Sequence, residues 1–254
     1  MLRTAITTVL GALIMASASN ATIRTKTIEY IHDGVTFEGF LAWDDAHKTP
    51  RPGVMVIHEW KGLESYAKSR TEQLAGLGYV AFAADLYGKG IRPQTPEEAG
   101  AQAGKLRADR PLMRARALAS LEVLAGQSIV DRNKLACIGF CFGGGATLEL
   151  ARNGAPLKGA VSFHGNLDTP NLIDANNIKA KVLVLHGAID PVISPESIAT
   201  FQKEMTDAKV DWQFVSYGGA VHAFTNPAAG ERYHPDAARR SWEAMKDFFD
   251  EIFE

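Results

Sequence analysis

Short apolar runs recur along the chain, and stretches with helical periodicity separate them. Residues 22–43 alternate apolar and polar positions around His32-Asp33-Gly34, which predicts an antiparallel hairpin. From Gly53 onward the apolar runs are continuous, as expected for strands that are covered on both faces. The predicted buried strands are residues 53–57, 79–84, 135–138, 159–163, 182–185 and 212–215.

The segments between these strands have the composition and spacing of helices. They are residues 65–77, 96–124, 144–152, 195–206 and 236–253, and Pro111 is expected to kink or split the second of them. Strand–helix alternation over residues 22–254 predicts one α/β domain, with a mainly parallel sheet covered on both faces and led by the hairpin. We find no internal repeat, low-complexity tract or linker.

The first 21 residues have the layout of a secretory signal peptide. Arg3 supplies a positive charge, residues 5–16 are almost entirely apolar, and small residues precede cleavage after either Ala18 or Ala21. A buried N-terminal helix is the alternative. The signal-peptide interpretation predicts a periplasmic or secreted protein with no stable membrane insertion after cleavage, because the apolar run is too short to span a bilayer.

The overall composition narrows the classes of function. The chain has 254 residues, of which 46% are hydrophobic, so a sizeable core is expected rather than disorder. Its formal net charge is only -2, which provides no general attraction for nucleic acid or for an anionic membrane. Two cysteines, Cys137 and Cys141, do not make a disulfide framework.

Residues capable of chemistry follow the predicted strands. In open parallel sheets, ligands bind beyond the carboxyl ends of the strands. The segments found there are His58-Glu59-Trp60, Asp85-Leu86-Tyr87, Gly139 to Gly144, His164-Gly165, His186 to Asp190, and His222.

The segment Gly139-Phe140-Cys141-Phe142-Gly143 has the spacing of a nucleophile elbow with cysteine in the nucleophile position. Such a tight strand-to-helix turn lifts the nucleophile above the sheet, and the helix N-terminus behind it favours a thiolate. The alternative is a buried structural cysteine in a glycine-rich turn. Cys137 falls within a strand and is expected to pack as a small hydrophobic residue, and a disulfide between the two would distort the elbow.

Two downstream residues have the chain order of the remaining members of a triad. Asp190 follows one strand and His222 follows the last strand, so nucleophile, acid and base occur in the order typical of this elbow. Taken singly, Asp190 is also compatible with a helix cap and His222 with an ordinary loop histidine.

These motifs together resemble the dienelactone hydrolase family, which consists of α/β-hydrolases with a Cys-Asp-His triad. The resemblance covers residues 22–254 and rests on Gly139 to Gly144, His186-Gly187-x-x-Asp190, and Val221-His222-Ala223-Phe224, with Glu59 also matching. It implies a Cys141–Asp190–His222 triad and a Glu59 that receives the thiol proton when substrate enters. It further implies that the Trp60 and Phe142 N–H groups form the oxyanion hole. A solvated loop carboxylate is the alternative for Glu59.

The substrate-binding positions differ from the family pattern. Members that act on dienelactone hold its carboxylate with two arginines. Lys89 or Arg92 is available near the first position, and the neutral Asn226 occupies the second. We therefore expect a small ester or lactone other than dienelactone. Tyr87 is either a pocket wall or a packed aromatic residue, and His164 is a further candidate for substrate binding.

Cofactor-dependent functions are less consistent with the sequence. Four histidines at strand ends suggest a metal site, but His58-Glu59 lacks the second histidine of H-E-x-x-H, so no metal is expected. Arg107, Arg110, Arg114 and Arg116 suggest a phosphate patch, yet they are better explained as a solvated helix face. No G-x-G-x-x-G segment follows a strand, so no nucleotide cofactor is expected.

The sequence therefore predicts a cofactor-independent hydrolase of small esters or lactones that acts through a Cys141 thiolate and an acyl-enzyme. The alternative from another class is a non-catalytic periplasmic binding protein on the same scaffold. A thiol redox function is a third hypothesis, but the spacing of Cys137 and Cys141 is not C-x-x-C. The preference among esters, lactones and thioesters and the oligomeric state remain open.

Overall fold

The structure is a computed structural model that describes residues 22–254. Its sheet contains the eight strands β1 (Ile23–His32), β2 (Val35–Asp44), β3 (Arg51–Ile57), β4 (Val80–Ala84), β5 (Val130–Phe140), β6 (Gly159–Phe163), β7 (Lys181–Gly187) and β8 (Trp212–Tyr217). The helices are α1 (Ser65–Gly76), α2 (Pro96–Ala108), α3 (Arg110–Ala125), α4 (Phe142–Arg152), α5 (Pro195–Asp207) and α6 (Pro235–Phe253). Two 3₁₀ segments, η1 (Leu172–Asn177) and η2 (Pro227–Arg232), complete the described elements.

The strands lie in the order β1-β2-β4-β3-β5-β6-β7-β8. β1 and β2 form an antiparallel hairpin, and β2 pairs antiparallel with β4. Every later pair in the order is parallel. Asp33 and Gly34 at the hairpin turn both have positive φ values, 48° and 74°, which suit the twist of a two-residue turn. The predicted architecture, a mostly parallel sheet led by an antiparallel hairpin, is confirmed.

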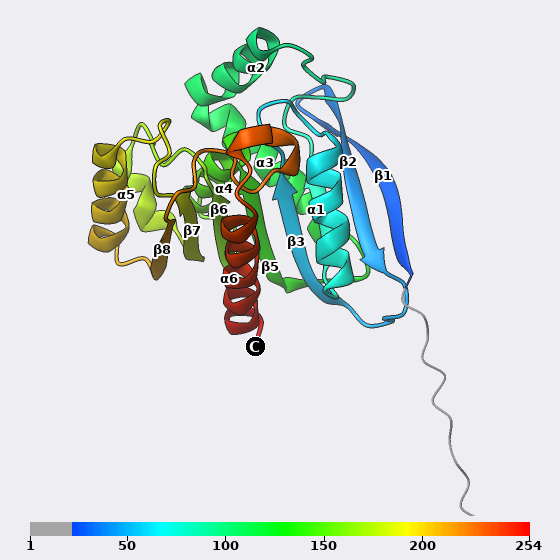
Figure 1. Cartoon of the computed structure of the whole chain (residues 1–254). Helices are drawn as coiled ribbons and strands as arrows, with labels where there is room; N and C mark the ends of the chain where they lie inside the picture. Colours follow the sequence, from blue (N-terminus) through cyan, green and yellow to red (C-terminus); the bar gives the residue numbers. More distant parts are fainter. Residues whose placement is uncertain (1–21) are drawn as a thin grey trace, which may run out of the picture.

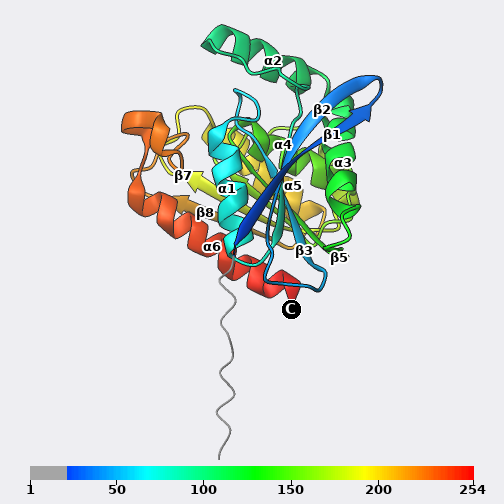
Figure 2. The ribbon, with the colours of Figure 1, turned by 90° about the vertical axis from the view of Figure 1, so that its right-hand side faces the viewer.

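The central strands are apolar on both faces because both faces are covered. On β3, Val54 and Val56 pack into the core beneath α1 and α6, whereas Met55 and Ile57 pack on the opposite side with residues of α3 and α4. Figure 1 shows α1 and α6 in front of the sheet. Figure 2, turned by 90°, shows α1 and α6 on one side of the strands and α3 on the other. This two-sided burial explains why the sequence shows continuous runs there rather than alternation.

Pro111 divides the long helical segment as predicted. α2 ends at Ala108 and α3 begins at Arg110, with Pro111 in the first turn of α3. The side chain of Asp109 accepts a hydrogen bond from the Leu112 N–H at 2.9 Å and so caps α3. A proline in a first helical turn removes no intrahelical hydrogen bond, so it starts the second helix without disturbing it.

The four arginines of this region form neither a phosphate patch nor a solvated face. Arg110 pairs with Asp168, Arg114 pairs with Glu149 and Asp174, and Arg116 donates to the Leu86 carbonyl. Arg107 donates to the Asn166 side chain. The expectation of a solvated face is therefore wrong, because each guanidinium reaches a carboxylate or carbonyl of another segment.

A buried ion cluster holds α4 against its neighbours. Arg152, which is fully buried, donates to both carboxylate oxygens of Glu204 on α5, at 2.8 and 2.7 Å, and to Glu149 at 3.1 Å. Arg114 on α3 meets Glu149 from the other side at 2.7 Å. Because α4 begins immediately after Cys141, this cluster fixes the helix that supports the elbow.

Two expectations concern the membrane and the N-terminus. The predicted signal segment, residues 1–21, lies outside the described residues and stays a prediction. Within residues 22–254, no helix is both long enough and apolar enough to cross a bilayer.

Replacing Arg152 tests the buried cluster. We expect Arg152→Met to lower the free energy of unfolding by about 3–5 kcal/mol, because it leaves buried carboxylates with one partner fewer. Lys203→Met removes an ion pair on a side chain that is 76% exposed, and it should cost less than about 1 kcal/mol. Urea unfolding followed by circular dichroism measures both, and equal losses in the two variants would contradict the account.

Candidate active site

The turn between β5 and α4 holds Cys141 in an unusual backbone conformation. Its φ is 54° and its ψ is −116°, and it stands at the N-cap of α4. A Cβ added to Gly139 would lie 2.0 Å from the Gly143 carbonyl oxygen, and one on Gly143 would lie 2.2 Å from the Ile57 carbonyl oxygen. Only glycine therefore fits at both positions, which is the physical reason for the Gly-x-Cys-x-Gly spacing.

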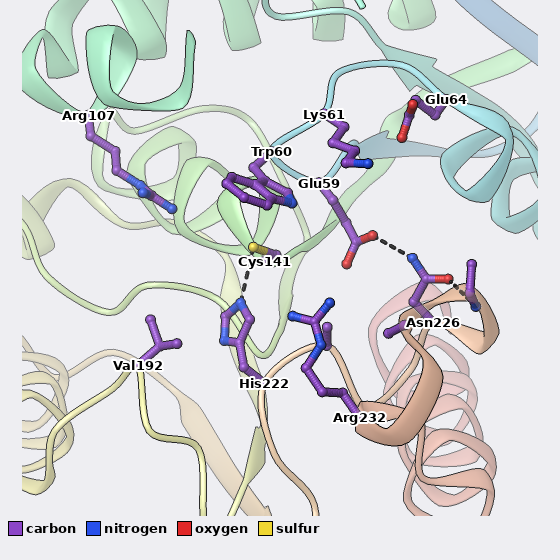
Figure 3. Close-up of a pocket in the computed structure, with 13 residues that line it drawn as sticks. Glu59, Trp60, Lys61, Glu64, Arg107, Cys141, Val192, His222, Asn226 and Arg232 are labelled. Carbon is purple, nitrogen blue, oxygen red and sulfur yellow. Dashed lines mark hydrogen bonds between the residues drawn. The ribbon is translucent and has the colours of Figure 1, made fainter. Parts of the chain in front are cut away.

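Three predicted residues meet above the sheet. The Sγ of Cys141 lies 3.1 Å from Nε2 of His222, and Nδ1 of His222 lies 2.9 Å from Oδ2 of Asp190 (Figure 3 shows the Cys141–His222 contact). All three are largely buried, with 9%, 9% and 7% of their surface exposed. These three side chains therefore lie in the spatial arrangement predicted from their chain order.

Backbone contacts hold the Asp190 and His222 loops against each other. The Ile189 N–H donates to the Ala220 carbonyl at 3.1 Å. The Val192 N–H donates to the Asp190 carboxylate at 2.8 Å, which leaves the other carboxylate oxygen for His222. Asp190 thus orients the imidazole and is itself oriented by its own loop.

The charges of this chain stabilise a protonated His222. Burial alone lowers the pKa of His222, but hydrogen bonds and charge interactions with Asp190 and Cys141 outweigh it and raise the pKa to about 10. Burial raises the pKa of Asp190, and the opposing contacts with His222 and Val192 bring it below its ordinary value. Cys141 therefore faces an imidazolium over the neutral pH range, an arrangement that favours a nucleophilic sulfur.

Cys137 lies in a different environment, as predicted. It is fully buried within β5, and both cysteines are free. Burial raises the pKa of the Cys137 thiol to about 12. Its sulfur lies 3.3 Å from the Thr147 hydroxyl. This thiol belongs to the core.

Glu59 is partly buried near the triad rather than fully solvated. Its carboxylate accepts a hydrogen bond from the Asn226 side chain at 2.6 Å. Burial raises the pKa of Glu59, while the Asn226 hydrogen bond and the charges of His222 and Arg232 oppose that rise. The sulfur of Cys141 is paired with His222 here, whereas Glu59 is paired with Asn226 (Figure 3).

The two predicted oxyanion-hole residues flank Cys141. Phe142 is the first residue of α4, where backbone N–H groups have no intrahelical acceptor. Trp60 lines the cavity above Cys141. The Tyr87 hydroxyl donates to the Trp60 carbonyl at 2.8 Å. Tyr87 thus supports the Trp60 loop from behind, and it is buried rather than part of the cavity wall.

A cavity of ≈ 380 Å³ opens over Cys141. Its wall includes three cationic side chains from separate segments, Lys61, Arg107 on α2, and Arg232 at the end of η2. Val192, Ala223, Ala228 and Ala229 supply apolar surface. Arg232 and the alanines of η2 were missed from the sequence, because no periodic pattern marks a 3₁₀ segment of six residues.

The structure corrects three of the predicted substrate contacts. Lys89 points outward to Glu29, and Arg92 is occupied by Glu38 and the Leu63 carbonyl, so neither lines the cavity over Cys141. His164 is fully buried behind the nucleophile. Of the predicted substrate-binding residues, Asn226 lines the cavity.

The strand-end histidines do not form a common cluster. His58 contacts two loops. Its Nδ1 lies 2.6 Å from the Glu59 carbonyl oxygen, and its Nε2 lies 3.2 Å from the Leu86 backbone nitrogen. Within residues 22–254, no group of three or more His, Cys, Asp or Glu side chains is arranged to hold a metal ion.

Comparison with known proteins adds an independent finding. The profile of the Dienelactone hydrolase family matches residues 37–253. A protein of Aquifex aeolicus named "Putative carboxymethylenebutenolidase" is 30% identical over 234 residues, which cover 88% of this chain and 97% of that protein.

Two solved structures are similar over nearly their whole length. The structure m3DLH is 43% identical with a TM-score of 0.89, and it covers 91% of this chain and 99% of its own. A dienelactone hydrolase-like promiscuous phosphotriesterase from metagenomic libraries is 40% identical with a TM-score of 0.88 and the same coverage.

The titration of His222 tests the electrostatic account. We expect Asp190→Asn to lower the pKa of His222 well below 10, because the carboxylate that favours the imidazolium is lost while the burial remains. Long-range ¹H–¹⁵N NMR of the imidazole nitrogens measures this shift. An unchanged His222 titration in the variant would contradict the account.

Substitution of the elbow glycines tests the steric account. Gly143→Ala should destabilise the fold or displace the elbow, because its Cβ would overlap the Ile57 carbonyl. Gly104→Ala, in α2 with nothing within 4 Å, should instead stabilise the protein by about 0.5–1 kcal/mol. Thermal unfolding should show a lower melting temperature for Gly143→Ala and a higher one for Gly104→Ala than for the native protein. A Gly143→Ala variant as stable as the native protein would refute the account.

Proposed function

The chain belongs to the dienelactone hydrolase family, and on this premise we propose that it hydrolyses small carboxylic esters or lactones through an acyl-enzyme on Cys141. The observation that carries the proposal is the continuous contact from Cys141 Sγ to His222 to Asp190, at 3.1 and 2.9 Å, at the base of a cavity. A binding protein without catalysis would not require a strained cysteine facing an imidazolium.

In the proposed acylation step, the Cys141 thiolate attacks the substrate carbonyl carbon. A C–S bond forms, and the carbonyl π electrons move to the oxygen, which the N–H groups of Trp60 and Phe142 stabilise. When the tetrahedral intermediate collapses, the C–O bond breaks and the leaving alkoxide takes the proton from Nε2 of His222. A thioester on Cys141 and a neutral His222 remain.

Deacylation reverses the proton movement. Neutral His222 takes a proton from water as the water oxygen attacks the thioester carbonyl. Collapse of this second intermediate expels the Cys141 thiolate and releases the carboxylic acid. The thiolate again faces a protonated His222, so the pair returns to its starting state.

We propose that Glu59 serves as the proton acceptor of a resting thiol, as the family resemblance implies. Its burial and raised pKa make it suitable for holding a proton, and Asn226 keeps its carboxylate beside the cavity. In the arrangement seen here the sulfur already faces His222, which corresponds to the reactive orientation.

The substrate proposed for this cavity carries an anionic group. Lys61, Arg107 and Arg232 surround the opening over Cys141, although Asn226 occupies the family's second arginine position. The expectation of a small ester or lactone other than dienelactone depended on Lys89, Arg92 and Asn226, whereas the cations that line the cavity come from other positions. The name of the Aquifex aeolicus relative is consistent with a carboxylate-bearing lactone.

The compartment is a separate proposal. We propose that the protein is exported, because residues 1–21 have the layout of a signal peptide. Comparison of the intact mass of the protein recovered from the periplasm with that of the full chain tests this directly.

Steady-state hydrolysis of p-nitrophenyl acetate tests the nucleophile. Cys141→Ala should lose at least about 10³-fold in kcat/KM, since removal of a nucleophile leaves only residual catalysis by the surrounding groups. Cys137→Ala, the matched control at the buried thiol, should retain activity close to that of the native chain. A dialkyl p-nitrophenyl phosphate in the same series tests whether the activity named for the metagenomic relative extends to this chain.

Two outcomes would reject the hydrolase proposal. Equal turnover by the native protein and Cys141→Ala would exclude Cys141 as the nucleophile. Tight binding of a small ester without turnover of any ester or lactone would favour the non-catalytic binding protein.

Replacement of Arg232 tests the anionic substrate. Arg232→Met should raise KM for 4-nitrophenyl hemisuccinate roughly tenfold, as expected for loss of one charged hydrogen bond, and leave the neutral 4-nitrophenyl butyrate nearly unchanged. Arg239→Met, on a side chain that is 63% exposed on α6, is the control. Equal effects of Arg232→Met on both esters would contradict this prediction.

A further inference from the structure

His164 lies directly behind the nucleophile and is fully buried. Its Nδ1 accepts a hydrogen bond from the backbone N–H of Cys141 at 3.2 Å, an N–H that also donates to the Phe163 carbonyl at 3.0 Å. Its Nε2 lies 2.7 Å from the hydroxyl of Thr225. One imidazole therefore joins the nucleophile's own backbone to the loop that carries His222.

The two contacts require a single protonation state. Because Nδ1 accepts from the Cys141 N–H, the ring proton is on Nε2 and is donated to Thr225. Burial lowers the pKa of His164 well below its ordinary value, and the charges of His222, Arg70 and His186 act in the same direction. The ring therefore remains neutral, and a protonated ring would lose its contact with the nucleophile's amide.

Thr225 extends this connection to α1. Its hydroxyl lies 2.8 Å from the Tyr66 hydroxyl, and its carbonyl accepts from Tyr66 at 3.0 Å and from Arg70 at 3.0 Å. Thr225 also directly precedes Asn226, the residue that holds Glu59. The contacts of His164 and Thr225 thus connect the elbow, the histidine loop and α1.

The segments joined in this way contain strained backbone. Cys141, His164 and Ala223 have φ values of 54°, 39° and 65°, although none is glycine. Such conformations persist only where surrounding contacts determine them strongly. Cys141 carries the sulfur, Ala223 directly follows His222, and His164 links the segments that hold the two.

We propose that His164 is a positioning residue that sets the distance between Cys141 Sγ and His222 Nε2, acting through Thr225. The proposal rests on the function proposed above. It replaces the sequence-based expectation of a substrate contact, because the ring of His164 is fully buried and does not line the cavity. Loss of the link should impair the acylation step while leaving substrate affinity largely unaltered.

Variants of Thr225 test the link without altering the nucleophile or its partner. Thr225→Val keeps the shape and removes the hydroxyl, and it should lower kcat roughly 10- to 100-fold with little change in KM, as expected for misplacement of reacting groups. Thr225→Ser should restore most of the rate. Thr71→Val is the matched control, because Thr71 is fully buried and its hydroxyl bonds only within α1, to Ala67.

Variants of His164 separate its two contacts. In His164→Asn the side-chain oxygen lies near the former Nδ1 and keeps an acceptor for the Cys141 N–H, whereas the contact with Thr225 is lost. In His164→Gln the side-chain amide reaches toward Thr225 and the acceptor for Cys141 is lost. Each should retain more activity than His164→Leu, which removes both.

The rate of iodoacetamide alkylation at Cys141 distinguishes positioning from loss of stability. At neutral pH, Thr225→Val should be alkylated more slowly than the native protein, because its Cys141 sulfur is displaced from His222. Thr71→Val should be alkylated at the native rate even if its melting temperature falls.

Two results separate the possible failures. Native alkylation and native kcat in both Thr225→Val and His164→Leu would overturn the positioning proposal and leave the proposed hydrolase intact. The opposite case is a native protein that hydrolyses no ester, although alkylation of Cys141 is slower in Thr225→Val than in the native protein. That result would reject the proposed function and retain the link through Thr225.

Discussion

The close approach of Gly143 to the carbonyl of Ile57 is the constraint on which the site depends. It lets α4 begin so near β3 that Cys141 is raised between the ends of β3 and β5 and forced to a positive φ. From that position the sulfur reaches Nε2 of His222. The buried Arg152 cluster holds the other end of α4, so the helix is fixed at both ends.

Buried charged groups occur in two settings, the ion cluster around Arg152 and the surroundings of His222. Around Arg152, carboxylates and guanidinium groups pair with one another, and the cluster joins α3, α4 and α5. Around His222, contacts with Asp190 and Cys141 together stabilise the protonated imidazole, and in the proposed mechanism this proton passes to the leaving group. The ring of His164 lies 5.3 Å from that of His222, and burial lowers its pKa well below the ordinary value, so it adds no positive charge beside the imidazolium.

Features set by local sequence were predictable. The elbow glycines, the strand-end positions of Asp190 and His222, and the break at Pro111 each follow from short-range sterics or chain order, and the structure has them where they were expected. The substrate-side residues were not predictable in this way. Lys89 lies on a loop and Arg232 ends the short 3₁₀ segment η2. Only the three-dimensional path of the chain brings Lys89 to Glu29 and Arg232 to the cavity. The role proposed for His164 likewise depends on its contact with Thr225, which is 61 residues away in the chain.

The most direct test of the central claim is to identify the residue that carries the acyl group. The native protein is mixed with p-nitrophenyl acetate, quenched with acid on the millisecond scale, digested and mapped by mass spectrometry. The account predicts a burst of p-nitrophenol close to one equivalent per chain and an acetyl group on the peptide containing Cys141. Turnover without a burst, or acetyl found on another residue while Cys141 stays free, would contradict it.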